Sequence, residues 1–291
     1  MKKINLKYIK TLISQKNSND ENFPVSSFLV DKKKKKHIKN FYKFARFSDD
    51  IADNKDLDSG EKIRILSHFD KLLSSGTESD LIFINDLIST LKNQSLTNEY
   101  PRKLLQAFIM DSTKLRYNNR KDLINYCNHS ASPVGRFVID LHMKTCEKRI
   151  LEKIYYSTDR LCNCLQILNH LQDIKEDFVR LDRVYLPLNF LNQEGINIDC
   201  LSKNQSTLGL EKVKLRCLKG VKLLLTESEK GLFLIKDKKL LRETLVIFFV
   251  AKKLANLLSK RDPLKKKIKL SRIDLIFCFF KGIMTPSKYK N

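Results

Sequence analysis

Glycine and proline are scarce in this chain, and their scarcity limits the folds open to it. The 291 residues include 8 glycines and 6 prolines, well below average usage, whereas turn-rich β folds depend on both residue types. Apolar residues make up 42% of the chain, enough for a large folded core. Since no internal repeat, low-complexity tract or domain boundary is visible, we predict one all-α domain.

Apolar side chains recur every three to four residues along most of the chain, which is the spacing of amphipathic helices. In the middle of the chain, Ser132 and Pro133 with Gly135 interrupt this pattern, which predicts a kink or a close backbone approach. The pattern predicts helices at residues 1–20, 32–54, 60–74, 79–92, 98–117, 120–128, 133–147, 151–179, 208–234, 237–260 and 270–283.

The formal charge of the chain is +23, from 56 Lys and Arg residues against 33 Asp and Glu. A nucleic-acid partner, an anionic membrane surface or compositional bias would each account for it. Two lysine runs, at residues 32–36 and 265–269, fit a membrane surface better than base readout, with solvated loop charge as the alternative. We expect no nucleic-acid partner, and a peripheral membrane contact as a secondary property.

Cysteine and histidine are dispersed along the chain. The seven cysteines form no C-x-x-C pair and the five histidines do not cluster, which predicts reduced thiols and no zinc site. The longest apolar stretches, such as residues 246–251 and 275–280, are far shorter than the roughly 20 residues of a membrane span. The N-terminus does not resemble a secretory signal. We therefore expect a cytoplasmic protein, with any membrane contact at the inner face.

A stripe of polar side chains in the helix predicted at residues 32–54 ends in an acidic pair. At about 100° per residue, Tyr42, Arg46, Asp49 and Asp53 share one narrow face. Carboxylates four residues apart lie one turn apart, so this pair can hold a cation together. Asp50 points about 100° away from Asp49, so the pattern alone does not place it with the pair.

The same arrangement recurs in the helix predicted at residues 151–179. There Gln166, Asn169, Asp173 and Asp177 share one face. Acidic pairs are common on exposed helices, and this alternative is open for either stripe alone. Because both stripes have apolar flanks, however, we expect each to face an internal cavity. Two such pairs facing each other would make one cation site.

The acidic pairs predict a magnesium and diphosphate site. Crowded carboxylates raise each other's pKa unless a cation joins them. All-oxygen ligands select a hard ion, and Mg²⁺ prefers a few carboxylates with phosphate oxygens and water. The cation would assist a diphosphate leaving group, and aromatic rings would stabilise the hydrocarbon cation left behind. Candidates for that lining, with core packing as the alternative role, are Phe23, Phe28, Phe41, Tyr42 and Phe137.

Three segments of the chain, taken in order, resemble the squalene and phytoene synthases, which are head-to-head prenyl synthases. They read YKFARFSDDIAD at residues 42–53, YCNHSASPVG at 126–135, and LQILNHLQDIKED at 165–177 followed by RVY at 183–185. The resemblance covers about residues 20–260. It implies the all-α isoprenoid synthase fold, as one domain over residues 1–291 around a central prenyl cavity, with a basic C-terminal helix at about 262–291.

The resemblance also implies a role for each matching residue. Arg46 and Arg183 would hold diphosphate oxygens, and Tyr185 would line the site beside Gln166 and Phe23. The small residues near the predicted kink would form a wall of the prenyl cavity, with helix packing as the alternative; they are Ala131, Val134 and Gly135. The implied magnesium ligands are Asp49, Asp53, Asn169, Asp173 and Asp177. The implied catalytic residues are the four aspartates of that set with Tyr42 and Tyr126.

One difference from the usual family motif points to a particular branch of the family. The family usually carries Arg before the first Asp of the second motif, where this chain has Gln172 after His170. Together with residues 21–25 and 132–137, this resembles the bacterial hydroxysqualene synthase branch. That branch, in squalene and hopanoid biosynthesis, is a Mg²⁺-dependent lyase that converts presqualene diphosphate and water into hydroxysqualene and diphosphate without NADPH. A more polar second motif is consistent with the admission of water.

Two alternatives stay open from the sequence. A presqualene diphosphate or phytoene synthase, which is a prenyltransferase, would condense two prenyl diphosphates instead of consuming a cyclopropyl product. A non-catalytic basic helical protein that binds membrane or nucleic acid would explain the charge of +23 without any enzyme. Besides a prenyl diphosphate substrate, other enzymes of the squalene pathway are expected partners.

Overall fold

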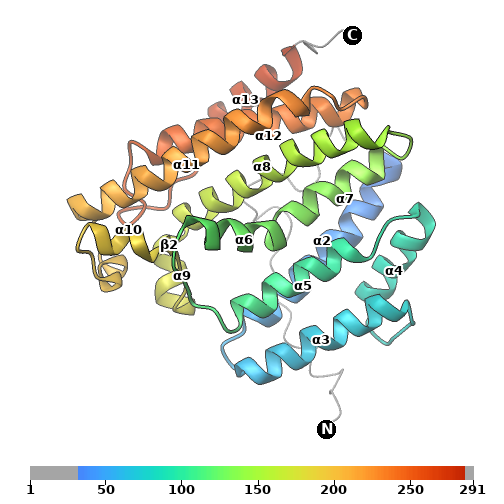
Figure 1. The fold of residues 1–291 in the computed structure, drawn as a ribbon, viewed down its shortest axis with the longest axis horizontal. Coiled ribbons are helices and arrows are strands. Elements are labelled where there is room, and N and C mark those ends of the chain that lie inside the picture. Colours follow the sequence, from blue (N-terminus) through green and yellow to red (C-terminus); the bar gives the residue numbers. More distant parts are fainter. Residues whose placement is uncertain (1–31, 286–291) are drawn as a thin grey trace. The chain divides into compact units, whose positions relative to one another are not determined.

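Helices make up about three quarters of residues 32–285, the part of the chain that the computed structural model describes (Figure 1). The all-α prediction is confirmed. The chain divides into two compact units, one ending at Lys114 and the other beginning at Leu115, and each is described by itself. The single domain stays a prediction.

Unit 1 holds the first acidic motif on a helix whose other faces are packed. Helix α2 contacts α3, α4 and α5, and α3 contacts α4 and α5. Asp58 caps α3 by accepting a hydrogen bond from the backbone nitrogen of Glu61 at 2.8 Å, and Gly76 ends that helix with a φ of 64°. The helices are α2 (Lys32–Asp53), α3 (Ser59–Ser75), α4 (Ile82–Gln94) and α5 (Glu99–Asp111).

Aromatic rings fix the orientation of α2 within unit 1. Phe47 stacks on Phe83 of α4 with ring centroids 4.2 Å apart, and Phe69 of α3 meets the same ring edge-on at 5.5 Å. Phe41 and Phe44 are buried. The burial of these phenylalanines in unit 1 agrees with the packing role weighed for Phe41 in the sequence.

Helix α8 lies at the centre of unit 2, where it packs against α6, α7, α11 and α12 (Figure 1). Two short strands pair in parallel beside it, with Arg116 opposite Val184. The elements are β1 (Arg116–Tyr117), α6 (Arg120–Ser130), α7 (Ser132–His142), α8 (Lys148–Gln172), α9 (Ile174–Leu181), β2 (Val184–Pro187), α10 (Leu188–Gln193), the 3-10 helix η2 (Ile198–Ser202), α11 (Leu208–Leu232), α12 (Lys238–Leu258) and α13 (Arg272–Met284).

The predicted interruption near Pro133 is confirmed. Ala131 separates α6 from α7, with φ −120° and ψ −47°. At Gly135 a Cβ would lie 2.6 Å from the Thr158 Cγ2 and from the Cys162 Sγ of α8. Such distances are too short for any side chain, so α7 reaches α8 through the bare backbone of Gly135.

Most predicted helices are present, and the differences have local causes. The helix predicted at 98–117 ends at Asp111, and residues 116–117 pair in β1 instead. The C-terminal helix begins at Arg272 rather than near residue 262, because Pro263 and adjacent like charges disfavour helix. The strands, α10 and η2 were not predicted. The helix predicted at residues 1–20, Phe23 and Phe28 lie outside the described residues.

Within residues 32–285, no helix is long and apolar enough to cross a membrane.

Candidate active site

The first acidic cluster surrounds the guanidinium of Arg46 on α2. Its Nη1 lies 3.1 Å from the Asp49 Oδ2, and its Nη2 lies 2.6 Å from the Asp50 Oδ1. The Asp50 side chain is buried, whereas that of Asp49 is 34% exposed. Asp50 therefore serves to hold Arg46 in place, and Asp49 is the carboxylate that an external cation can reach. Tyr42, one turn earlier on the predicted stripe, is half-buried.

Asp49 shows the electrostatic strain predicted for crowded acids. Burial raises the pKa of Asp49 well above its ordinary value, the charges of Asp53, Asp111 and Asp50 raise it further, and Arg46 offsets part of the rise. Asp111 is buried and is the last residue of α5. The surroundings of Asp49 thus disfavour its negative charge on balance, which favours binding of a cation at this carboxylate.

The second acidic cluster spans the junction of α8 and α9 in unit 2. The structure ends α8 at Gln172 and begins α9 at Ile174, so the single helix predicted at residues 151–179 is divided at Asp173. The helical hydrogen bonds nevertheless continue, because the Asp173 nitrogen donates to the Asn169 carbonyl at 2.9 Å and the Asp177 nitrogen to the Asp173 carbonyl at 2.8 Å. The predicted stripe therefore survives the break.

A lysine from a distant segment contacts this cluster. The ammonium of Lys267 forms an ion pair with Asp173 and lies 3.6 Å from the Glu176 carboxylate. Burial lowers the pKa of Lys267, but the hydrogen bond and charge of Asp173, with Glu176, outweigh it and raise the pKa overall. A positive charge already sits where the sequence predicts a metal ion.

Gln172 anchors the segment that contains Lys267 to α8. Its side chain is buried, and its Nε2 donates to the Ile268 carbonyl at 2.5 Å. Gln172 stands where the family usually has arginine, a difference that the sequence links to the admission of water. In the structure, Gln172 has a structural role, because it anchors the residue next to Lys267.

Aromatic rings from four elements lie together beside the second cluster. His170 of α8 and Tyr185 of β2 stack with centroids 3.5 Å apart, and Tyr126 of α6 lies 5.4 Å from Tyr185. Tyr117 of β1 completes the group, 5.3 Å from Tyr126 and 5.4 Å from Tyr185. The parallel pairing of β1 with β2 brings these tyrosines together, which the helix pattern alone does not predict.

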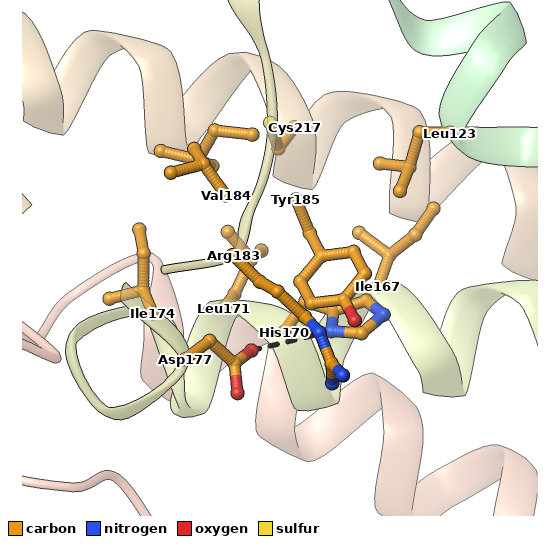
Figure 2. Close-up of a pocket in the computed structure, with 11 residues that line it drawn as sticks. Leu123, Ile167, His170, Leu171, Ile174, Asp177, Arg183, Val184, Tyr185 and Cys217 are labelled. Atoms are coloured by element: carbon orange, nitrogen blue, oxygen red, sulfur yellow. Dashed lines mark ion pairs between the residues drawn. The ribbon is translucent and has the colours of Figure 1, made fainter. Parts of the chain in front are cut away.

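His170 links the aromatic group to the acids (Figure 2). Its Nδ1 lies 3.5 Å from the Asp177 Oδ2, and its Nε2 lies 3.1 Å from the Gln166 Nε2. Because the amide nitrogen of Gln166 can only donate, the His170 Nε2 accepts and its Nδ1 carries the hydrogen that faces Asp177. The imidazole thus orients Asp177.

Figure 2 also shows Arg183 extending past Asp177 toward the His170 ring. Arg183 is buried, and its backbone nitrogen donates to the Asp177 carbonyl at 3.0 Å. These side chains line a cavity of about 10 Å³ with Tyr185 and several aliphatic residues. That volume is about the space of one water molecule and far too small for a prenyl chain.

The three small residues near the kink have different surroundings in unit 2. Ala131 is nearly buried, Val134 is 39% exposed, and Gly135 packs on Thr158 and Cys162 of α8. Gly135 thus packs closely on α8, and its role in the wall of a prenyl cavity stays a prediction. Of the predicted site residues, Phe23 lies outside the described range.

Buried thiols offer no nucleophile or metal ligand here. The cysteines of residues 32–285 are free, as predicted. Burial raises the pKa of Cys162 and of Cys217 to about 12, so both stay protonated at neutral pH.

The donor sets fit Mg²⁺ shared with a phosphate ligand. Within residues 32–285, no group of three or more His, Cys, Asp or Glu side chains is placed to hold a metal by itself. Mg²⁺ commonly takes one or two carboxylates and fills its octahedron with water and phosphate oxygens. The raised pKa of Asp49 and the ammonium beside Asp173 both mark carboxylates that favour a cation.

Sequence reasoning missed three residues at these clusters. Asp111 was placed inside a helix predicted to continue to residue 117, and Lys267 inside a lysine run interpreted as surface charge. Tyr117 was assigned to a helix rather than to β1. No local signal distinguishes them, because each reaches its cluster through tertiary packing.

Comparison with known proteins identifies the family of this chain. The family model described as squalene/phytoene synthase matches residues 16–274. The chain belongs to the squalene/phytoene synthase family. The resemblance drawn from its motifs is confirmed.

Relatives named hydroxysqualene synthase align with most of the chain. That of Sinorhizobium fredii is 35% identical over 263 residues, which are 88% of this chain and 86% of the relative. That of Rhodopseudomonas palustris is also 35% identical, over 92% of this chain and 90% of the relative. A phytoene synthase of Zea mays is 30% identical over 131 residues, 45% of this chain and 32% of that protein.

Solved structures of the same fold confirm the isoprenoid synthase architecture. A dehydrosqualene synthase matches with a TM-score of 0.79 at 20% identity, over 95% of this chain and 94% of that one. The squalene synthase of Alicyclobacillus acidocaldarius matches with a TM-score of 0.72 at 24% identity, over 87% and 92%.

Proposed function

We propose that this protein is a hydroxysqualene synthase, a lyase that converts presqualene diphosphate and water into hydroxysqualene and diphosphate. The observation that supports this most strongly is the extent of the likeness. Identity of about 35% to hydroxysqualene synthases extends over about nine tenths of the chain, whereas the phytoene synthase match extends over less than half. Membership of a synthase family also favours an enzyme over a non-catalytic basic protein.

The two acidic clusters would bind the diphosphate through Mg²⁺. We assign Asp49 and Asp53 as ligands in the first cluster, and Asn169, Asp173 and Asp177 in the second. When bound, Mg²⁺ neutralises the charge that develops on the departing diphosphate oxygens. The imidazole of His170 holds Asp177 in position for this role.

Basic side chains beside each cluster would complete the diphosphate site. Arg46 is held by Asp50, which fixes its guanidinium for contact with phosphate oxygens. Arg183 is held at Asp177 through its backbone. Lys267 pairs with Asp173, and we propose that its ammonium turns to a phosphate oxygen when a metal ion binds the carboxylate.

The reaction balances without an added reductant. The carbon–oxygen bond to diphosphate breaks, and its electron pair leaves with the diphosphate. The cyclopropyl cation rearranges, the oxygen of water attacks the resulting carbocation, and the attacking water loses a proton. Tyr42, Tyr126 and Tyr185 are the aromatic residues that we assign to the site, where ring faces stabilise a passing carbocation.

Substrate choice tests the assignment. With Mg²⁺, purified protein should convert presqualene diphosphate into hydroxysqualene, and it should leave farnesyl diphosphate unchanged. Asp173→Asn should abolish turnover, while the exposed Asp56→Asn should retain it. Formation of presqualene diphosphate or phytoene from prenyl diphosphates would instead show a head-to-head prenyltransferase, the runner-up function.

A further inference from the structure

Helix α13 presents its most apolar stripe away from the protein. At about 100° per residue, Ile273, Ile276, Phe277, Phe280 and Met284 fall within about 60° of one line along the helix. All five side chains are exposed, from 55% at Ile276 to 79% at Ile273. An amphipathic helix of a globular protein normally buries this stripe, so its exposure indicates a partner surface.

The opposite side of α13 is firmly seated on unit 2. Cys278 and Gly282 are its buried residues, and a Cβ at Gly282 would lie 2.6 Å from the backbone nitrogen of Val246 in α12. An ion pair of 2.8 Å joins Asp274 to Lys253. Figure 1 shows α13 running along the outer side of α12. The apolar stripe is therefore held outward by packing on its reverse face.

Basic residues gather in the segment that leads into α13. The segment before α13 lines a cleft of about 680 Å³ with lysines, among them the exposed Lys265, Lys266 and Lys269. Two acids also line the cleft, but each is already engaged. Asp262 accepts hydrogen bonds from Ser206, and Glu211 pairs with the buried Lys214. The cleft thus keeps a positive balance suited to phosphate groups.

The exposed apolar stripe and the lysines together indicate which partner binds this surface. We propose that α13 and the exposed Lys265, Lys266 and Lys269 form a docking surface for an anionic lipid bilayer, with α13 lying in the interface and lipid phosphates at the lysine cleft. An interfacial helix of this kind combines an apolar stripe with Lys and Arg. The 13 residues of α13 extend about 20 Å, too short to span a bilayer core of about 30 Å.

A second copy of the chain fits this surface less well. In a symmetric dimer the same patch meets itself, so the lysines of both copies would approach each other and repel. A nucleic acid would leave the apolar stripe exposed to water. An anionic bilayer satisfies both halves of the surface at once.

Vesicle flotation of the full-length protein tests this proposal without reference to catalysis. The protein should float with vesicles of phosphatidylcholine and phosphatidylglycerol at low salt, and should not float with phosphatidylcholine alone. Replacing both rings, as Phe277→Ser with Phe280→Ser, should weaken partitioning roughly 100-fold. Lys265→Gln with Lys266→Gln should weaken it by about fivefold per lysine.

The control variant is Leu208→Ser, which removes an apolar side chain that is 86% exposed at the start of α11; it should float as wild type does. Circular dichroism of each variant establishes that it is folded. Absence of flotation with anionic vesicles, equal flotation with neutral vesicles, or unchanged flotation of the folded double-serine variant would each overturn the proposal. So would a dimer in light scattering that the serine pair dissociates and that does not bind vesicles.

Discussion

Lys267→Met is expected to strengthen metal binding while weakening the metal-free fold. The Lys267 ammonium is paired with Asp173, so a metal ion that takes this carboxylate must first displace it. The two side chains are 39% and 22% exposed, and ion pairs of such exposure contribute about 0.2–1 kcal/mol. Methionine keeps most of the stem and removes the charge.

The expected changes in metal affinity and in stability follow from this free-energy range of the ion pair. Removing the competing ammonium should lower the Kd for the metal by up to about fivefold, since 1.4 kcal/mol corresponds to tenfold. Without metal, the lost pair should lower Tm by about 2 °C or less in a chain of this size. Affinity and metal-free stability are thus expected to change in opposite directions.

Electron paramagnetic resonance with Mn²⁺ as the stand-in for Mg²⁺, in the absence of any diphosphate, measures the affinity. Scanning calorimetry with a chelator measures the stability. Lys266→Met, in the same run of lysines, is the control and should change neither. A Kd that is unchanged or raised in Lys267→Met would refute the idea that this lysine occupies the position of the metal.

Two further perturbations test the clusters and the packing of the α8 scaffold. In protein without metal, the pKa of the Asp49 carboxyl group is higher in the folded state than in the unfolded state. The protonated carboxyl group therefore favours the folded state, and this contribution to stability is lost as pH rises from about 4 through the folded pKa. Asp49→Asn should therefore be more stable than wild type at pH 7 in urea unfolding with a chelator, and equal stability would contradict the crowding. Gly135→Val should cost about 1–3 kcal/mol in the same assay, because its Cβ meets Thr158 and Cys162 at 2.6 Å; Val134→Ala is the exposed control, and a fully stable but inactive Gly135→Val would favour a cavity wall over packing.

The sequence predicted well what depends on local spacing. The stripe of Asn169, Asp173 and Asp177 survives in the structure because its hydrogen bonds continue through the break in the helix. The close approach at Gly135 was also predicted, since a proline followed closely by a glycine inside a helical stretch favours a kink or a tight helix contact. Both features are set by residues within a few positions of each other.

What the sequence did not predict depends on distant segments. Lys267 reaches Asp173 because the buried Gln172 binds the Ile268 carbonyl, a contact between residues far apart in the chain. Asp111 raises the pKa of Asp49 because α5 packs against α2. Helical periodicity carries no information on either pairing, and a run of lysines looks the same whether or not one of them turns inward.

The origin of the product oxygen tests the central claim most directly. Purified protein is incubated with Mg²⁺ and presqualene diphosphate in water enriched in ¹⁸O, and the product is analysed by mass spectrometry. Capture of the carbocation by water predicts hydroxysqualene that carries one ¹⁸O atom, formed together with one diphosphate. A hydrocarbon product without oxygen, or hydroxysqualene that retains ¹⁶O, would contradict the account.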